Sequence, residues 1–599
     1  MPAKTKRYPT PIRKQLFPST LLLRSEWDSL WEVENAQPSR PFFQFLLLVG
    51  FLVLIGCSGA PSNGDVADLV LRDGVVYTMD GNRSVAESIA VSAGRILAVG
   101  PTSGIENLIG PETRIIDLKG RMVLPGFQDS HLHPVTGGIE LGQCNLNGLQ
   151  SGEEVLSTVR AFAEKHPDAE WIVGGGWDLP LFPKANPHRT ALDRIVSDRP
   201  VYLTAADGHS AWVNSRALEM ADITRRTADP LNGRIERDPD GIPSGTLRES
   251  AMDLVSKHLP ETTEEDRIEG LRKTLRMAAR FGITSMIEAS ADEDLLQAYR
   301  LLDERGELTA RVTVSQYVDP EGTPGQLDRL IERAERFTGG RFEAHSAKFF
   351  VDGVIESHTA ALLAPYLDRP GDAGELIWQP EKLRLAASEL NQAGIQLHFH
   401  AIGDRAIRAT LDLLQDIQQR EGGLRKRPHL AHIELFDPAD IPRFAQIGAV
   451  ANFQPLWAYA DSYITDLTEP ILGPERSRWL YPIRSLFESE ALVVSGSDWS
   501  VSSMNPLDAI QVAVTRQPLD GSTPVWIPEE KVSLDEMLAS YTINGALLLG
   551  KEAEHGSLEV GKRADLLVLD HDMRSVAPAE IHRVQVDLTL LEGEVIWQR

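Results

Sequence analysis

The sequence feature that most constrains this chain is the segment at residues 124–134, LPGFQDSHLHP. It places an apolar run before two histidines, His131 and His133, and ends at a proline. Because successive side chains of a β-strand point to opposite faces, histidines two positions apart project to the same side. Two imidazoles on one side of a rigid strand form half of a metal site. The segment therefore predicts a buried strand that ends in metal ligands, with packing or chance as the alternative explanation of the pair.

The middle of the chain alternates between strand-like and helix-like segments, the pattern of a parallel sheet with crossover helices. We predict an α/β fold built on a (β/α)8 TIM-like barrel. Its eight strands are assigned to residues 124–131, 283–288, 311–317, 346–351, 395–400, 429–433, 448–454 and 491–497. Two further strand-like segments, 171–173 and 201–204, are assigned to an insertion at about residues 142–250.

Both ends of the chain carry strand patterns without the helical segments of the middle. Residues 67–124 repeat a strand–turn–strand form, and residues 555–599 are strand-like again. Because the edges of a small sheet need a cover, we expect the two ends to meet in one composite β-sandwich. The barrel with its insertion then occupies residues 125–554, and residues 57–66 are a linker.

Length and charge exclude some classes of protein. A chain of 599 residues is longer than one hydrophobic core usually supports, which agrees with a large domain plus a smaller one. The formal net charge of −26 argues against a nucleic-acid partner, because phosphate binding needs clustered Lys and Arg. Hydrophobic residues make up 42% of the chain, as is ordinary for a globular protein.

Residues 1–56 are predicted to be a signal peptide or an N-terminal anchor. The uncharged apolar run at residues 41–56 is short for a membrane-spanning helix and is typical of a signal-peptide core. Residues 54–57, Leu-Ile-Gly-Cys, resemble the bacterial lipobox, which implies lipidation of Cys57 and a protein anchored in the cell envelope, facing the periplasm. A mis-assigned start would instead leave a cytoplasmic protein. Cys144 is the only other cysteine, so no disulfide framework is expected.

Polar residues that can bind metal lie at the ends of several predicted barrel strands. The active sites of such barrels form at the C-terminal ends of the strands. We therefore expect the side chains at these positions to converge on one mouth of the barrel. They are His131, His133, Lys348, His400, His432 and Asp498.

All of these residues except His432 belong to a series of short motifs that follow one another in order. The motifs are PGFQDSHLH at 125–133, WD at 177–178, GHSAWVNS at 208–215, KFFVDG at 348–353, HAIGDRA at 400–406, GSD at 496–498 and GKRADL at 561–566. Together they resemble the amidohydrolase superfamily, and within it the branch called amidohydrolase family 3 or YtcJ-like. The resemblance covers residues 67–599.

The resemblance implies a centre of one or two divalent metal ions, zinc first, with iron, manganese, cobalt or nickel as alternatives. The implied roles are His131 and His133 as ligands of one ion, His400 and His432 as ligands of a second, Lys348 as a bridging carbamate, and Asp498 as ligand and catalytic base. The chemistry is sound, because a neutral lysine that captures CO2 becomes a carboxylate. Paired metal ions polarise a carbonyl and lower the pKa of a shared water.

Several of these residues also have plainer interpretations. Lys348 could be an ion-paired core residue, which would leave a site for one metal. His398 could replace its neighbour His400 as a ligand, although a supporting hydrogen bond or packing role is favoured for it. His429 competes in the same way with His432. Asp498 could cap the helix that follows it.

Substrate contacts are expected from the insertion and from the loop after the fourth strand. His209 is predicted to reach over the site and hold the reacting carbonyl oxygen, with a structural hydrogen bond as the equal alternative. Trp177, Asp352 and His358 are predicted to contact substrate, with packing as the alternative for the tryptophan. Relatives often carry Arg at position 358, so the contact there is expected to differ.

The predicted function is a metal-dependent amidohydrolase that cleaves a carbon–nitrogen bond of an amide, an N-substituted formamide or a cyclic amide. The alternatives are a hydrolase of esters or other bonds at the same centre, and a non-catalytic binding or regulatory protein of the envelope. The expected partner is a small amide-like molecule, with membrane contact only through the N-terminal lipid or anchor. A homodimer is one of the oligomeric states left open.

Overall fold

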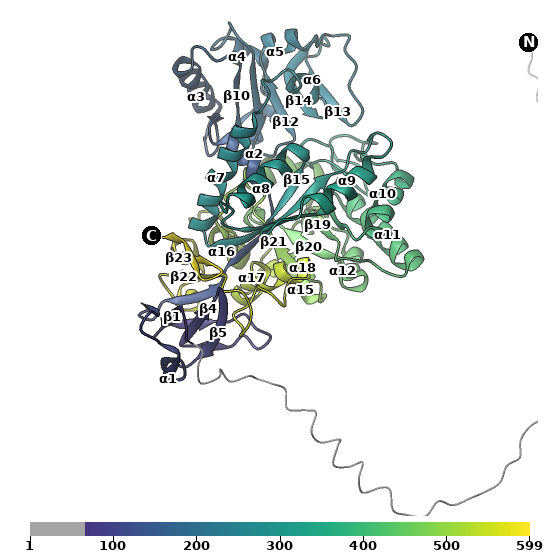
Figure 1. Cartoon of the computed structure of the whole chain (residues 1–599). Helices are drawn as coiled ribbons and strands as arrows, with labels where there is room; N and C mark the ends of the chain where they lie inside the picture. The colour runs from purple at the N-terminus through teal and green to yellow at the C-terminus, as the bar shows by residue number, and fades with distance from the viewer. Residues whose placement is uncertain (1–65) are drawn as a thin grey trace, which may run out of the picture. The chain divides into compact units, whose positions relative to one another are not determined.

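The computed structural model describes residues 66–599 (Figure 1). The apolar run at residues 41–56 and Cys57 lie outside the described residues, so the signal-peptide and lipidation predictions stay predictions. Within the described part of the chain, no helix is both long and apolar enough to cross a membrane.

An eight-stranded parallel sheet forms the barrel, and it confirms the predicted fold class. Its strands are β8 (Phe127–Leu132), β15 (Ile283–Ala291), β16 (Arg311–Tyr317), β17 (Phe342–Phe350), β18 (Gln396–Ala401), β19 (His429–His432), β20 (Val450–Phe453) and β21 (Val493–Ser495). They pair in sequence order. The first barrel strand starts later than predicted, because Leu124 pairs with Leu567 in another sheet.

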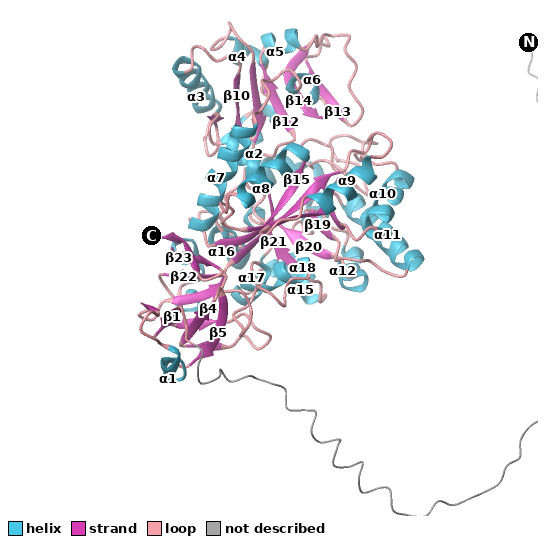
Figure 2. Ribbon diagram, viewed as in Figure 1, coloured by secondary structure: helices cyan, strands magenta, loops and turns pink. Residues whose placement is uncertain are grey.

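Helices surround the barrel strands on the outside (Figure 2). They include α7 (Glu264–Arg280), α8 (Glu293–Glu304), α9 (Gln326–Arg336), α10 (Pro380–Gln392), α11 (Asp404–Glu421) and α12 (Ile441–Ile447). Helix α7 begins at a capping box between Thr263 and Asp266, which satisfies otherwise unpaired backbone donors. Its apolar residues Leu271 and Leu275 are buried in the main hydrophobic core.

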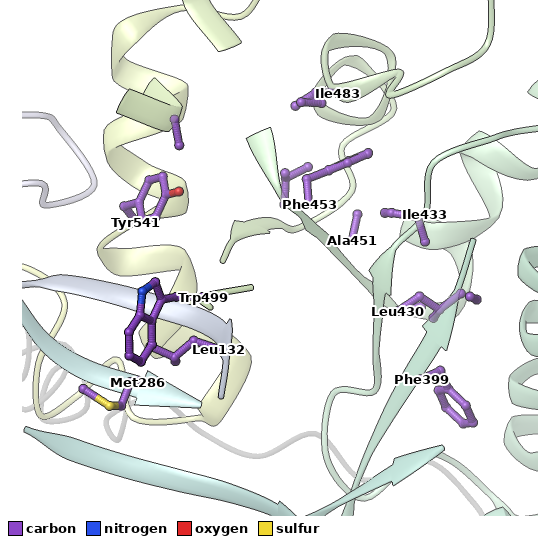
Figure 3. Packing of buried hydrophobic residues seen from close by; sticks show 14 of the residues in the cluster. Leu132, Met286, Phe399, Leu430, Ile433, Ala451, Phe453, Ile483, Trp499 and Tyr541 are labelled. Atoms are coloured by element: carbon purple, nitrogen blue, oxygen red, sulfur yellow. The ribbon is translucent and has the colours of Figure 1, made fainter. Parts of the chain in front are cut away.

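Alternation along the strands separates a polar interior from an apolar exterior. Lys348 of β17 pairs with His398 of β18, and the intervening Phe349 pairs with Phe399. The two phenylalanine rings stack with centroids 5.1 Å apart and belong to the same hydrophobic core as the helices. Figure 3 shows Phe399 and Leu430, on neighbouring strands, among the packed apolar side chains of this core. The other faces of these strands are thereby free to carry polar groups.

The barrel closes between β21 and β8 through one very close approach. A Cβ atom at Gly496 would lie 2.6 Å from the backbone nitrogen of His131, so a larger residue would push the two strands apart. The backbone nitrogen of Asp498 donates to the carbonyl oxygen of His131 at 2.7 Å. This contact fixes the residues after the last strand against the end of the first.

Residues between the first two barrel strands form a separate six-stranded sheet. Its strands are β9 (Cys144–Asn145), β10 (Ile172–Trp177), β11 (Val201–Ala205), β12 (Ser210–Val213), β13 (Gly233–Arg237) and β14 (Pro243–Glu249). The segments at 171–173 and 201–204 thus contribute to this sheet and not to the barrel. Buried Cys144 packs in its hydrophobic core, as an apolar residue would.

Strands from both chain ends combine in a further sheet, with order β24-β23-β22-β7-β2-β3. These strands are β24 (Glu594–Gln598), β23 (Val586–Leu591), β22 (Leu566–Leu569), β7 (Met122–Pro125), β2 (Val75–Tyr77) and β3 (Val85–Ala86). A four-stranded sheet of β5 (Arg95–Gly100), β4 (Ser88–Ser92), β1 (Leu69–Arg72) and β6 (Arg114–Asp117) shares a core with it. The chain ends therefore form one additional sheet domain beside the barrel.

Candidate metal centre

Three side chains at the mouth of the barrel bring donor atoms together. Nitrogens of His131 and His133 and an oxygen of Asp498 all lie within 4.8 Å of one another. The Nε2 atoms of His131 and His133 are 3.4 and 3.3 Å from Asp498 Oδ1. This Oδ1 atom is buried and accepts no hydrogen bond. Two imidazoles, a carboxylate and an unsatisfied buried oxygen are what a divalent cation would need.

Buried hydrogen bonds orient the His131 ring. Its Nδ1 atom lies 2.9 Å from His398 Nε2, and His398 Nδ1 lies 2.9 Å from the Ser315 hydroxyl. Burial lowers the pKa values of both histidines well below the usual range, so both rings are neutral. With Nδ1 engaged by His398, the Nε2 lone pair of His131 is directed to the centre. His398 is thus a supporting residue, as the sequence favoured.

Carboxylates flank His133 on two sides. Glu288 Oε1 is 3.7 Å from His133 Nδ1, and the Tyr299 hydroxyl donates to the other oxygen of Glu288 at 2.8 Å. Burial opposes the charge on His133, but Asp498 and Glu288 outweigh it and raise its pKa to about 9. The two carboxylates therefore favour a positive charge at this position, and without a metal ion the proton on His133 provides it.

Asp498 is held in an unusual backbone conformation. Its φ of 52° lies in the left-handed region, which costs a non-glycine residue on the order of 1 kcal/mol or more. The Asp129 carboxylate, which accepts from the Ser497 backbone nitrogen at 3.0 Å, and the bond to His131 hold this segment. The helix that follows is α16 (Pro506–Thr515), and the side chain of Asn505 caps it. The helix-cap interpretation of Asp498 is therefore wrong.

Lys348 lies beside the triplet without a charged partner. The residue is 1% exposed, and its Nζ atom is 3.4 Å from His131 Nε2 and 4.9 Å from the Phe350 ring centroid. Across residues 66–599, no carboxylate oxygen comes within 4.0 Å of Nζ, so the ion-paired interpretation does not hold. Burial lowers its pKa to about 7, against the charges of Asp498 and Glu288. A neutral amine at this position is accessible near pH 7.

The side chains of His400 and His432 also lie at the mouth of the barrel, but outside the close group of donor atoms. Their ring centroids are 4.5 Å apart, and His432 Nδ1 lies 3.8 Å from Asp498 Oδ2. His432 Nδ1 also contacts Gln454 Oε1 at 3.0 Å, and His400 Nε2 lies 3.3 Å from the Gly353 carbonyl oxygen. Neither histidine joins the group of donor atoms within 4.8 Å that the described residues form. Burial lowers both pKa values well below the usual range, so both rings offer free lone pairs.

The competing histidine lies deeper in the barrel. His429 stacks on His398 with ring centroids 3.9 Å apart, and its Nδ1 atom is 3.2 Å from the Asn452 amide nitrogen. His432, by contrast, lines the cavities at the mouth. Of the two candidates on β19, His432 is the one placed to meet a ligand.

The insertion brings His209 to the mouth of the barrel. Its ring centroid is 5.3 Å from that of His400, and its Nδ1 atom is 2.8 Å from Glu249 Oε2. Burial opposes a charge on His209, but Glu249 outweighs it and raises the pKa to about 9. Asn214, in the same motif, caps helix α5 (Ser215–Met220) through a bond to the Ala217 nitrogen, and its role is structural.

Two predicted substrate contacts are wrong, and a third is indirect. Trp177 is 0% exposed, and its indole nitrogen donates to the Leu203 carbonyl at 2.9 Å inside the core of the insertion. His358 lines neither cavity, because it turns away to bond Asp368 at 3.0 Å. Asp352 lines one cavity, but its carboxylate oxygens accept hydrogen bonds from backbone nitrogens, such as that of Gly403 at 2.9 Å. It holds two loops together.

Two connected cavities meet at the centre. One, of about 820 Å³, includes His131, His133 and Lys348 in its wall. The other, of about 390 Å³, extends under the insertion. His209, His400, His432 and Asp498 line both cavities. A ligand at the centre can therefore extend to either side.

Sequence reasoning missed several residues that support or line the site. They are Glu288, Glu249 and Gln454, which bond predicted residues, and the cavity residues Glu356, Glu434 and Asp461. Glu288 and Gln454 lie at or just past the end of a predicted strand, so that position alone could have identified them. Glu434 likewise follows directly after the predicted strand at 429–433, whereas Glu356 and Asp461 lie further along in loops and carry no such signal.

Comparison with known proteins agrees with this site. The model of a family described as the amidohydrolase family matches residues 114–597. The protein LONG AFTER FAR-RED 3 of Arabidopsis thaliana is 32% identical, over 85% of this chain and 88% of its own. YtcJ of Bacillus subtilis is 29% identical over 88% and 99%. An N-substituted formamide deformylase of Arthrobacter pascens is 28% identical over 89% and 98%.

Solved structures share the architecture. An uncharacterized metal-dependent hydrolase from Pyrococcus furiosus superposes with a TM-score of 0.65 at 27% sequence identity. The match covers 84% of this chain and 99% of that one. This chain and that metal-dependent hydrolase therefore share one overall architecture.

Proposed function

Because the chain belongs to the amidohydrolase family and is a metal-dependent hydrolase, we propose that it cleaves the carbon–nitrogen bond of an amide. The observation that carries the proposal is the convergence of His131, His133 and Asp498, whose donor atoms lie within 4.8 Å of one another. The relative that deformylates N-substituted formamides makes such amides the first substrates to test. Esters are the second class, because the same centre can act on them.

The residues present fit a divalent metal ion. His131, His133 and Asp498 would hold one ion, and zinc suits this set of two imidazoles and one carboxylate. His400 and His432, together with Lys348, would hold a second. A divalent ion bound there supplies Lewis-acid polarisation of the substrate carbonyl and lowers the pKa of a bound water.

The proton transfers fall to Asp498. As the water oxygen bonds to the carbonyl carbon, Asp498 accepts the proton that the water releases. When the carbon–nitrogen bond breaks, Asp498 returns that proton to the departing nitrogen, so that an amine and a carboxylic acid leave. Its fixed backbone favours this role, because an acceptor that is already placed needs no reorganisation.

His209 is proposed to stabilise the oxygen of the reacting carbonyl. Its Nδ1 atom is engaged by Glu249 at 2.8 Å, which leaves Nε2–H to donate into the cavity. A pKa of about 9 keeps the ring protonated at neutral pH. A protonated donor is most useful where negative charge develops in the transition state.

Lys348 is proposed to be carbamylated. Its neutral amine would bond to the carbon of CO2, release one proton and become a carboxylate. Among the described residues, no carboxylate oxygen lies within 4.0 Å of Nζ. An ion pair therefore does not account for the burial of this amine. A carbamate there would bring a negative charge between the two groups of histidines.

Metal removal tests the proposal. Full-length protein is assayed with N-benzylformamide and N-butylformamide as prepared, after dialysis against a chelator, and after addition of zinc or manganese. Turnover is expected to disappear with the chelator and to return with the metal. Unchanged turnover in chelator, or no hydrolysis of any amide or ester by the metal-loaded protein, contradicts the proposal.

A further inference from the structure

The smaller cavity is lined by carboxylates that the proposed reaction does not use. Besides Asp498, its wall contains Asp178, Asp207, Glu356, Glu434 and Asp461. Between residues 66 and 599, no Lys, Arg or His nitrogen pairs with any of these five within 4.0 Å. This is unusual, because buried charges are normally paired. We call these five residues and the space between them the acidic chamber.

Neutral groups satisfy the chamber carboxylates only in part. The Tyr463 hydroxyl donates to Asp178 at 3.3 Å, and the Thr468 hydroxyl donates to Glu356. Asp207 Oδ2 is buried and accepts no hydrogen bond. Glu434 lines the cavity although only 6% of its surface is exposed. Acceptor capacity is therefore left over and faces the cavity. Burial raises the pKa of Glu356 to about 7 and that of Asp461 to about 6, so only part of this acceptor capacity is ionised carboxylate at neutral pH.

Aromatic side chains complete the wall of the acidic chamber. Trp457, Tyr459, Tyr463 and Tyr481 all line the same cavity. The Trp457 ring lies parallel to that of His432, with centroids 5.9 Å apart, which places it next to the metal centre. Aromatic faces attract organic cations, and the attraction is stronger where water is excluded.

The spacing of the carboxylates argues against a metal ion in the chamber. Among the described residues, none of these five carboxylates belongs to a group of His, Cys, Asp or Glu donor atoms as close together as that of His131, His133 and Asp498. The chamber carboxylates stand further apart, around a cavity of about 390 Å³. That volume is in the range of small-molecule sites and suits an alkyl chain that ends in a charged group.

We propose that the acidic chamber binds a positively charged group of the substrate, an alkylammonium or guanidinium, while the bond to be cleaved lies at the metal centre. This inference rests on the proposed function, because the two regions share one cavity through His209, His400, His432 and Asp498. The preferred substrates are then amides whose distal end is cationic. The barrel supplies the reaction, and the chamber selects the molecule.

Matched probes test the proposal. N-formyl-1,5-diaminopentane and N-hexylformamide have the same length and differ in a terminal ammonium or methyl group. For the zinc-loaded, full-length protein we expect kcat/KM to be at least roughly tenfold higher for the ammonium compound. Binding of hexylammonium and 1-hexanol, measured by ligand-observed NMR titration, should show the same preference without any hydrolysis.

Substitutions assign the preference to the chamber. The double variant Glu356→Gln/Glu434→Gln removes two carboxyl groups at nearly constant volume and should reduce the kcat/KM ratio of the two amides to about one. Asp461→Asn is the second variant, in case the double variant does not fold by circular dichroism; it should lower the ratio severalfold. Glu375→Gln, at an exposed glutamate, is the matched control and should keep the ratio.

The outcomes separate the two proposals. Equal binding of hexylammonium and 1-hexanol overturns the ammonium site, as does a ratio that stays high in the folded chamber variants. Preferential hexylammonium binding by a metal-loaded protein that hydrolyses neither of these two amides, nor any other amide or ester tested, supports the chamber and overturns the proposed hydrolase function instead.

Discussion

The two ends of the active-site cavity are built in opposite ways. At one end, imidazoles and a lysine lie on barrel strands, and buried partners such as His398 and Glu288 hold them. At the other end, carboxylates such as Glu434 and Asp461 lie in loops and, among the residues that the structure describes, have no cationic partner within 4.0 Å. The rigid scaffold therefore fixes the reaction, while the loops can change the substrate without disturbing it.

The largest effect is expected at the metal end, from Asp498→Asn. The amide cannot accept the proton of the attacking water and is a weaker ligand, so kcat/KM should fall by about 10³-fold or more. Steady-state kinetics with N-benzylformamide, together with metal analysis, measures this loss. Asp168→Asn, at an exposed aspartate, is the control and should retain full activity. Activity within a few fold of wild type in Asp498→Asn would remove this residue from the mechanism.

A smaller effect is expected from His398→Phe, which removes the 2.9 Å contact to His131 Nδ1 and keeps a ring of similar size. Loss of such a supporting bond typically weakens metal binding by about 10- to 100-fold. Competition with a chromogenic chelator measures the affinity, and saturating zinc should restore most of the turnover. Because His398 supports the metal end and not the acidic chamber, this variant should keep the preference for hexylammonium over 1-hexanol. Unchanged zinc affinity would mean that His398 serves packing alone.

The mildest effect is a displaced pH profile. His209 has a raised pKa of about 9, so its protonated, donating form is present below that pH and is lost above it. We expect kcat/KM to decline as pH rises through about 9. Glu249→Gln removes the charge that sustains the raised pKa, so the decline should begin at a lower pH, nearer the usual range of histidine. A decline at the same pH in both proteins would assign it to another group.

The same contrast explains what the sequence could predict. His131, His400 and Asp498 can be predicted because each lies at the C-terminal end of a predicted strand or directly after it. Lys348 lies inside a strand, two residues before the end of β17, and strand alternation and barrel topology then fix where the four meet. The chamber residues, such as Asp461, come from segments without periodicity, so nothing local predicts their meeting. Trp177 was misassigned because its motif marks the core of the insertion, which aromatic content alone cannot distinguish from a pocket wall.

Strand β7, which leads directly into the first barrel strand, has β22 as one of its two partners. That partner lies much later in the chain, after all eight barrel strands. The sheet beneath the first metal ligands thus stays open at this edge until the whole barrel has been synthesised. A premature stop between β21 and β22 would leave a polypeptide that has every barrel strand but whose β7 edge is bare and prone to aggregate.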